Sequence, residues 1–309
     1  MVSFVTWNLY AGADLTPLFR AAPPQIPQRV TEVFRQFLAT HFSVRAKAIA
    51  SAIAEKRPDV IGFQEVSLVQ FTIPNVDVVI YDFLQMVVSQ LKNRGLHYEV
   101  AVINDNVLFQ LPTSHGNEVR MLDRDVILLR KDSGYKVIHR QKGIFTTNFT
   151  VRIGRGSCTI LRGWSFVDIE GKKALRVINT HLDSYSPGVQ VAQGMELLSG
   201  PAHTTLPLIL LGDLNSNATG SDTPTYGNFI ASGLHDLWLE VGKGQGFTCC
   251  QDSDLLNGVS GLHQRIDYIL FKNGWTPGEA LLLGENQWSR RERGLWPSDH
   301  AGVYGSLRI

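Results

Sequence analysis

A chain of 309 residues with 44% hydrophobic and 18% charged residues has the composition of a folded globular protein and can bury a sizeable core. Its formal net charge is only +1, which excludes a strong overall field drawing it to nucleic acid or an anionic membrane. A protein whose net charge is near zero can still carry a local basic groove, so nucleic acid stays among the candidate substrates.

The chain start and the apolar runs indicate a soluble protein. The N-terminal residues lack the basic start and long apolar stretch of a secretory signal, and no apolar run is long enough to span a bilayer. On the sequence as given we expect a cytoplasmic monomer. An exported protein whose signal had been removed would read the same way, so the compartment stays open.

Three cysteines, Cys158, Cys249 and Cys250, make an odd number and give no disulfide framework. Adjacent cysteines rarely bridge each other, because the geometry of such a bridge is strained. We therefore expect small buried thiols. The spacing of Cys and His residues does not indicate a zinc site.

In chain order, the first half of the sequence alternates short strands with helices. The patterns predict a strand at Val2–Leu9, a loop at Ala21–Pro27, helices at Gln28–Thr40 and Ser43–Glu55, a strand at Val60–Phe63, a helix at Asn75–Arg94, and strands at Tyr98–Ile103, Val126–Leu129 and Tyr135–Arg140. Ser43 is the expected N-cap of the second helix, and Gly95 suits the end of the third. Apolar residues from Val79 to Leu91 recur at helical spacing, which favours one helix there.

The second half continues the alternation. It contains predicted strands at Cys158–Asp168 and Lys173–Leu182, a helix at Val189–Leu198, a strand at Leu206–Leu211, a helix at Pro224–Ser232, and strands at Arg265–Phe271 and Ala301–Ile309. Glu170-Gly171 is typical of a hairpin turn. In the absence of a linker or an exact repeat, we predict one α/β domain over residues 1–309, a four-layer α/β/β/α sandwich of two packed mixed sheets with outer helices.

Several predicted strands end in polar or ionisable residues, where a core strand turns out into solvent. The segments are Thr6-Trp7-Asn8, Phe63-Gln64-Glu65, Ile178-Asn179-Thr180-His181, Leu211-Gly212-Asp213-Leu214-Asn215, Arg265-Ile266-Asp267-Tyr268 and Ser298-Asp299-His300. Ligand sites in α/β proteins gather at strand ends, because the scaffold is rigid there and the loops are free. If these ends meet at one rim, they combine carboxylates, histidines and asparagines in one site.

Carboxylates crowded into one cleft need a cation, because like charges a few ångströms apart disfavour joint ionisation. Oxygen ligands without thiols favour Mg²⁺, with Mn²⁺ or Ca²⁺ as alternatives, over zinc. Without a Ser or Cys nucleophile motif, the pattern indicates direct attack of water on a phosphoric ester. Each residue taken alone also has a structural explanation, such as an Asx-turn or a strand cap, so the inference depends on the segments jointly.

All six segments, in this order, resemble the endonuclease/exonuclease/phosphatase superfamily. It includes deoxyribonuclease-I-like nucleases, apurinic endonucleases, neutral sphingomyelinases and inositol-polyphosphate 5-phosphatases. The resemblance runs from Thr6 to His300 and implies a divalent-metal-dependent phosphoric ester hydrolase. Trp7-Asn-Leu-Tyr-Ala-Gly-Ala-Asp14, Thr223-Pro-Thr-Tyr226 and Phe247-Thr-Cys-Cys-Gln251 are similar to a poorly characterised bacterial branch, which leaves the substrate open.

The resemblance also implies which residues hold the metal and which act on water. Asn8 and Glu65 would hold the metal, with Glu65 as the direct ligand, and Asp299 would lie close to it. Asp267 would orient His300, which activates or positions the attacking water. A carboxylate partner fixes the tautomer of a histidine and raises its basicity, which agrees with this assignment.

Three further residues receive roles by the same resemblance. Asp213 and Asn215 would hold the nucleophile and a phosphate oxygen. His181 would donate to a phosphate oxygen, where negative charge grows in the transition state. Candidate substrate contacts, weighed against ordinary structural roles, are Arg124, Asp183, Trp296 and Arg290.

The substrate is expected to be a phosphodiester, with nucleic acid favoured over lipid. A nuclease is the first choice because two arginine clusters, Arg290, Arg291 and Arg293 and then Arg152 and Arg155, could clamp phosphates. A sphingomyelin or phospholipid phosphodiesterase is the alternative and would use an apolar loop such as Gln70–Ile80 or Gly294-Leu295-Trp296. An inositol-phosphate phosphatase and a non-catalytic binding protein are less favoured.

Overall fold

The structure, a computed structural model, describes residues 1–153, 156–290 and 292–309. Two arginines of the predicted clusters, Arg155 and Arg291, lie outside the described residues. Among the helices within these ranges, none has the length and apolar character needed to cross a membrane.

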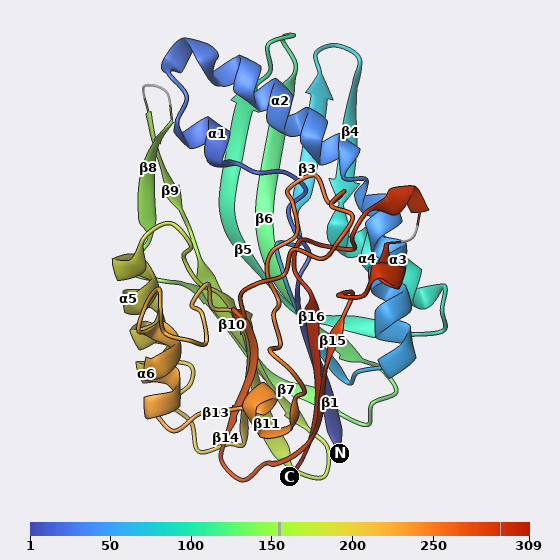
Figure 1. Cartoon of the computed structure of the whole chain (residues 1–309), viewed down its shortest axis with the longest axis vertical. Helices are drawn as coiled ribbons and strands as arrows, with labels where there is room; N and C mark the ends of the chain where they lie inside the picture. The colour runs from blue at the N-terminus through green and yellow to red at the C-terminus, as the bar shows by residue number, and fades with distance from the viewer. Residues whose placement is uncertain (154–155, 291) are drawn as a thin grey trace.

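Two large mixed sheets pack face to face (Figure 1). The first contains, in spatial order, β15 (Thr276–Leu283), β16 (Gly302–Arg308), β1 (Val2–Asn8), β2 (Val60–Gln64), β6 (Glu118–Arg130), β3 (Leu68–Ile73) and β4 (Asp77–Asp82), and β5 (Tyr98–Pro112) also pairs with β6. The second contains β13 (His235–Asp236), β14 (Asp267–Lys272), β12 (Leu208–Asp213), β11 (Ala174–His181), β10 (Gly163–Glu170) and β7 (Lys136–Ile144). A separate hairpin joins β8 (Phe149–Ile153) to β9 (Gly156–Ile160).

Helices cover the outer faces of both sheets. Those beside the first sheet are α2 (Ile26–Ala39), α3 (Phe42–Lys56) and α4 (Phe83–Lys92), while α5 (Pro187–Ser199) and α6 (Thr225–Ala231) cover the second (Figure 1). Two shorter helices are α1 (Thr16–Phe19) and α7 (Leu237–Val241). The predicted α/β/β/α sandwich is therefore confirmed.

Three apolar cores correspond to the three interfaces between these layers. One joins Trp7 and Phe63 of the first sheet to the helices on its outer face. The second lies between the sheets, where side chains such as Phe4 and Leu211 meet. The third places Leu210 against Phe229 of α6 and neighbouring residues. Successive residues of a strand point to opposite faces, so buried strands supply both cores at once.

The helix predicted at Asn75–Arg94 is wrong in its first part. Residues Asp77–Asp82 instead form β4, which pairs antiparallel with β3. Val78 and Ile80 are β-branched and fit an extended edge strand better than a helix. Helix α4 begins only at Phe83, because the Asp82 carboxylate accepts hydrogen bonds from the backbone N–H groups that follow it.

Two smaller predictions also need correction. Ser43 is not the N-cap of α3, since the helix begins at Phe42 and its cap is His41. Phe42, the first residue of the helix, stacks its ring on Phe83 in the core. The strand predicted at Cys158–Asp168 is divided, because β9 ends at Ile160 and β10 starts at Gly163.

The expectation of free thiols at Cys249 and Cys250 is wrong, because the two form a disulfide across a cis peptide bond. The rarity of such bridges is a general argument from local geometry. The backbone of Cys249 pairs antiparallel with both Gln264 and His300, which places the cysteine pair beside that histidine. Cys158 is a free thiol, as expected, but it is half-buried and not fully buried.

Gly62 lies where the two sheets pack tightly against each other and provides a test of their packing. A Cβ added there would lie 2.7 Å from Asn179 Oδ1 and 3.1 Å from Leu211 Cβ. We expect Gly62→Ala to lower the free energy of unfolding by about 1–3 kcal/mol through overpacking. Urea unfolding measures the change. Gly227→Ala, in the open space around α6, is the control and should not destabilise; equal losses in both variants would contradict the packing.

Candidate active site

Strand register brings the predicted polar ends to one rim. β1 and β2 run parallel, as do β11 and β12, so Asn8, His181 and Asp213 all close their strands on the same side. Asp213 stands opposite Asp267, the first residue of β14. His300 lies two residues before the start of β16, the antiparallel neighbour of β1. Residues almost 300 positions apart in the chain therefore share one site.

A histidine held between two carboxylates forms the centre of the site. His300 Nδ1 lies 2.8 Å from Asp267 Oδ2, and His300 Nε2 lies 3.8 Å from Asp213 Oδ2. Burial opposes protonation of His300, but the carboxylates of Asp267, Asp299 and Asp213 outweigh it and raise the pKa well above its usual value. Asp267 thus fixes the ring so that Nε2 faces Asp213.

Asn8 and Glu65 form the next part of the rim. The Asn8 amide donates to Glu65 Oε1 at 3.2 Å and to Asp213 Oδ2 at 3.1 Å. Glu65 also accepts a 2.6 Å hydrogen bond from the backbone N–H of Ala11. Its φ of 54° lies in the left-handed region, which costs a non-glycine residue about 1–2 kcal/mol. The sharp turn after β2 directs this carboxylate back toward β1.

His181 is poised as a hydrogen-bond donor. Arg162 Nη1 lies 2.7 Å from His181 Nδ1, and because a guanidinium can only donate, Nδ1 must accept. Burial, together with the charges of Arg162 and His300, lowers the pKa of His181 well below its usual value. The neutral ring therefore carries its proton on Nε2, which lies 3.5 Å from Asp213 Oδ2.

The acids of the site fit a bound cation. Burial, followed by the charge of Asp267, raises the pKa of Asp213 to about 7. Burial and the nearby Glu65 carboxylate raise the pKa of Asp299 to about 6. Ligand atoms of Asp213, Asp267 and His300 lie within 4.8 Å of one another. Accumulated carboxylates that resist ionisation are the arrangement that a hard divalent cation relieves.

Asn215 lies beside Asp213 and is fixed by the backbone. Its N–H donates to Asp213 Oδ1, and its side-chain amide donates to the Leu182 carbonyl. A φ of 49° places it in the left-handed region, which asparagine tolerates better than most residues. The chain thus turns sharply at the end of β12.

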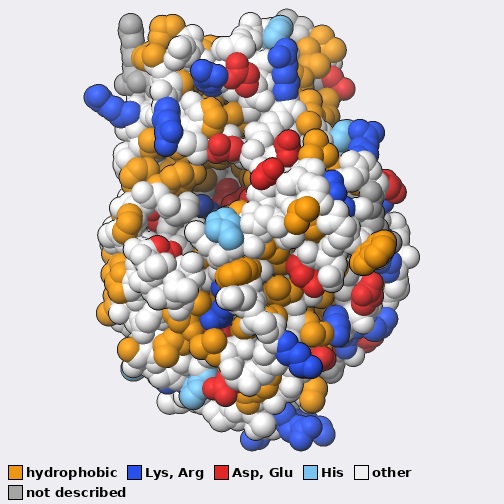
Figure 2. All heavy atoms as spheres, viewed as in Figure 1, with side chains coloured by type: hydrophobic (Ala, Val, Ile, Leu, Met, Phe, Trp, Pro, Cys, Tyr) orange, Lys and Arg blue, Asp and Glu red, His pale blue; other side chains and the backbone are white. Residues whose placement is uncertain are grey.

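A cleft of about 450 Å³ opens beside these residues. Glu65, Asp299 and Cys250 line it together with Arg162 and Asp123. Figure 2 shows a hollow on this face with acidic side chains inside it. The remaining lining is largely apolar and includes Leu15, Phe19, Val107, Phe109, Met121, Ile160 and Tyr185. An apolar cavity of about 50 Å³ adjoins the cleft and shares Ala11, Ala13, Leu15, Phe109 and Met121 with its wall.

The four residues considered as substrate contacts lie in structural positions. Arg124 is buried, donating to the Val66 carbonyl and pairing with Asp82 at 2.6 Å. Asp183 is fully buried, and its Oδ1 accepts from two backbone N–H groups of the turn that follows. Neither residue lines the cleft, because both support the loops behind it.

Trp296 and Arg290 are also tied into the structure. Trp296 has no exposed surface, and its Nε1 donates to the Asn257 carbonyl. The Arg290 guanidinium lies over the Trp296 ring at 5.7 Å and donates to the carbonyls of Leu256, Gly258 and Gly294. Its donors are directed at the backbone and do not face the cleft.

Arg162 and Asp123 are the site residues that the sequence did not indicate. Arg162 lies in the connection between β9 and β10, and its Nη1 is 3.4 Å from Asp123 Oδ2. Its Nε and the second oxygen of Asp123 are buried without a partner among the described residues. A single arginine between two apolar runs carries no local signal of function.

Comparisons with known proteins agree with this fold. Solved structures with the same fold include a Bacteroides thetaiotaomicron mannosyl-6-phosphatase, at 17% identity and a TM-score of 0.62, with all of both chains covered. An endonuclease/exonuclease/phosphatase family protein from Leptotrichia buccalis is 16% identical, with a TM-score of 0.63 and all of both chains covered. A humanized D. rerio TDP2 is 18% identical, with a TM-score of 0.60, and the match covers 100% of this chain and 99% of the TDP2 chain.

No curated protein matches the sequence. The family model described as Endonuclease/Exonuclease/phosphatase family matches residues 5–300, a range that includes every residue of the site described above. The members of this family are hydrolases that act on phosphoesters. The chain belongs to the endonuclease/exonuclease/phosphatase family.

Proposed function

We propose that this protein hydrolyses a phosphoric ester by direct attack of water, with the help of a divalent cation. The observation that carries the proposal is the position of His300. Asp267 fixes its Nδ1, and its Nε2 faces Asp213, beside a cleft that is lined by Glu65 and Asp299. This is the arrangement of a general base next to a cation site.

Glu65, Asp299 and Asn8 are the residues that would hold the cation, with Mg²⁺ the expected ion and Mn²⁺ or Ca²⁺ as alternatives. Oxygen-rich ligand sets without thiolates suit these hard ions. When bound, the cation would supply positive charge that offsets the charge of the phosphoryl oxygens. In the described structure the oxygen of the Asn8 amide accepts from the Tyr10 N–H, so Asn8 would have to turn its amide to become a ligand.

Side chains of the protein itself would orient the attacking water and accept its proton. A water between His300 Nε2 and Asp213 would be oriented by both, and the imidazole would accept its proton in the molecules in which His300 is neutral. Asp267 stabilises the imidazolium that results. His181, with its proton on Nε2, would donate to a phosphoryl oxygen, and Arg162 keeps that tautomer in place. Asn215 supports Asp213 from the adjacent turn.

Two substrate classes are candidates, nucleic acid and a lipid phosphodiester, and the lining of the cleft favours the lipid. A nuclease was the first expectation, but Arg162 is the one arginine among the cleft-lining residues described, against Asp14, Glu65, Asp123 and Asp299. A lipid phosphodiester is supported by the apolar wall and by the adjoining cavity. The β3–β4 hairpin adds an exposed apolar surface at Val76 and Ile80, which are 75% and 55% exposed.

Removing the central histidine tests the site. We expect His300→Ala to lower kcat by about 10²–10⁴-fold, because general-base catalysis contributes that much. Turnover of bis-p-nitrophenyl phosphate is measured with Mg²⁺, Mn²⁺ and Ca²⁺, and circular dichroism verifies the fold. His235→Ala, which removes an exposed histidine, is the matched control. Full activity of His300→Ala would exclude the assigned role.

Neutralising Glu65 tests the cation site. We expect Glu65→Gln to raise the metal concentration needed for half-maximal activity by about 10–100-fold, the range seen even for changes beyond the direct ligands. A titration of activity with Mg²⁺ measures the change. Glu99→Gln, at an exposed position of β5, is the control. An unchanged titration in Glu65→Gln would remove Glu65 from the set of ligands.

The response to salt separates the two substrate classes. For a lipid-like phosphodiester we expect turnover in mixed micelles to change little with salt. For a nucleic acid held by 6–10 phosphate contacts, affinity falls by about 10³–10⁵ between 50 and 200 mM salt. Plasmid DNA, RNA, sphingomyelin and a lysophospholipid are compared at both concentrations. Turnover of DNA or RNA alone, with a steep loss in salt, would favour the nuclease.

A further inference from the structure

The segment Thr248–Gln251 joins the two parts of the chain that carry His300 and its carboxylate partner. Thr248 Oγ1 accepts from the backbone N–H groups of Ile266 and Asp267, and the Thr248 carbonyl accepts from Ala301. The Gln251 N–H donates to the Asp299 carbonyl. The cysteine pair in the middle of this segment is thereby fixed next to His300. The proposed hydrolysis gives these two cysteines no role.

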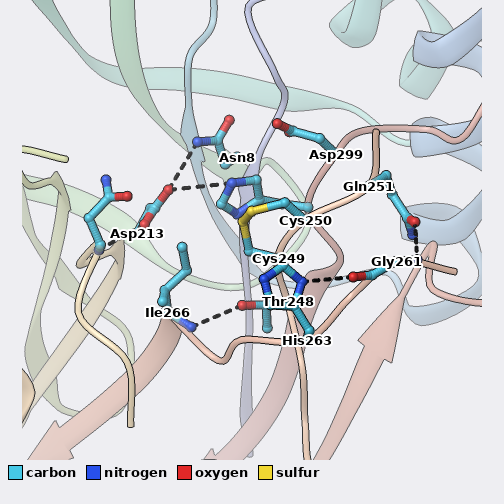
Figure 3. Close-up of a disulfide and its surroundings, with 12 residues drawn as sticks. Asn8, Asp213, Thr248, Cys249, Cys250, Gln251, Gly261, His263, Ile266 and Asp299 are labelled. Atoms are coloured by element: carbon cyan, nitrogen blue, oxygen red, sulfur yellow. Dashed lines mark hydrogen bonds and ion pairs between the residues drawn. A yellow bond between two sulfur atoms is a disulfide. The ribbon is translucent and has the colours of Figure 1, made fainter. Parts of the chain in front are cut away.

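Figure 3 shows the Cys249–Cys250 disulfide beside Asn8, Asp213 and Asp299. Cys249 is 2% exposed, whereas Cys250 is half-buried and lines the cleft. One ligand atom from each cysteine and one ring nitrogen of His300 lie within 4.8 Å of one another. Because Asp267 occupies Nδ1, the ring nitrogen available to a ligand is Nε2.

We propose that reduction of this disulfide creates a binding site for a thiophilic divalent cation of the Zn²⁺ or Cd²⁺ type, held by Cys249, Cys250 and His300. A dithiol reductant supplies two electrons and two protons, so the S–S bond becomes two thiols while the reductant forms its own disulfide. The cation then displaces the thiol protons. Two thiolates and one imidazole are a zinc-type donor set, and three protein ligands leave one position open.

The surroundings of His300 support this donor set. Histidines that bind metals usually donate their other ring N–H to a carboxylate, which fixes the ring and raises its basicity. Asp267 Oδ2, 2.8 Å from Nδ1, has that relation to His300. Cys250 provides access from the cleft. The sulfur ligands also distinguish this site from the oxygen set of Glu65 and Asp299, which suits hard cations.

The proposed metal site has a consequence for hydrolysis, and this consequence alone rests on the proposed function. A metal bound to His300 Nε2 would occupy the nitrogen assigned to the attacking water. The disulfide would therefore keep the histidine free, and reduction in the presence of Zn²⁺ would stop turnover. The redox state of two adjacent cysteines would decide which metal chemistry the site supports.

Titration with Cd²⁺ tests the site directly, because the ultraviolet charge-transfer band of a cadmium–thiolate bond reports sulfur ligation alone. With the full-length protein reduced by a dithiol that is then removed, we expect the band to saturate at one equivalent. The oxidised protein should give no band. Cys250→Ser should bind Cd²⁺ at least 100-fold more weakly, and Cys158→Ser, the matched control, should bind like the unmodified chain.

A reduced protein without the band, or a Cys250→Ser variant that binds as tightly as the parent, would overturn the proposal. If Cys250→Ser fails to fold, Asp267→Asn keeps the test open, because loss of the carboxylate behind a metal-ligating histidine weakens affinity by about 10–100-fold. Unchanged affinity in that variant would remove His300 from the ligands.

Activity is measured separately, so the two proposals can fail independently. One equivalent of Zn²⁺ should lower turnover of the reduced protein at least tenfold and leave the oxidised protein unaffected. A cadmium–thiolate band in a protein that hydrolyses no ester would reject the proposed function and keep the metal site. Hydrolysis that is insensitive to Zn²⁺ in the reduced protein, without a band, would reject the metal site alone.

Discussion

The site depends on one buried cation, the guanidinium of Arg45. It has 1% of its surface exposed and donates to the backbone carbonyls of Thr40, Leu9, Tyr10 and Pro297. These carbonyls belong to the loop after β1, to the turn before α3 and to the segment before His300. Hydrogen bonds to a charged group contribute about 1.5–3 kcal/mol each, so this one side chain fixes three loops at once.

The other contacts around Arg45 extend the same constraint. Trp7 Nε1 donates to the His300 carbonyl, and Ser298 Oγ donates to the Asn8 carbonyl. The first strand of the chain and the segment before its last strand are therefore held together where the proposed site residues Asn8 and His300 lie. Burial lowers the pKa of Arg45 to about 10, which still leaves it charged at neutral pH, and its charge offsets part of the repulsion between Glu65 and Asp299.

Strand ends, more than helices, set the geometry of the site. Asn8, His181 and Asp213 end parallel strands whose register is fixed by buried side chains on both faces, so a shift of one residue would turn each side chain away. Ionising all of the carboxylates gathered there is unfavourable without a cation, because like charges lie close together. Burial and the charges of Arg162 and His300 lower the pKa of His181, whereas the carboxylates of Asp267, Asp299 and Asp213 raise the pKa of His300.

The sequence by itself determined the fold class and which strand-end residues are candidates for the site. Strand patterns and the polar residues that end them are local features, and here they follow one another in a fixed order along the chain. Tertiary structure decided what local patterns leave ambiguous. An apolar run became β4 because a neighbouring strand paired with it, and Trp296 was packed inside by Tyr10 and Leu255. Arg162 met His181, and Cys249 joined Cys250 beside His300, because pairing between distant segments placed them there.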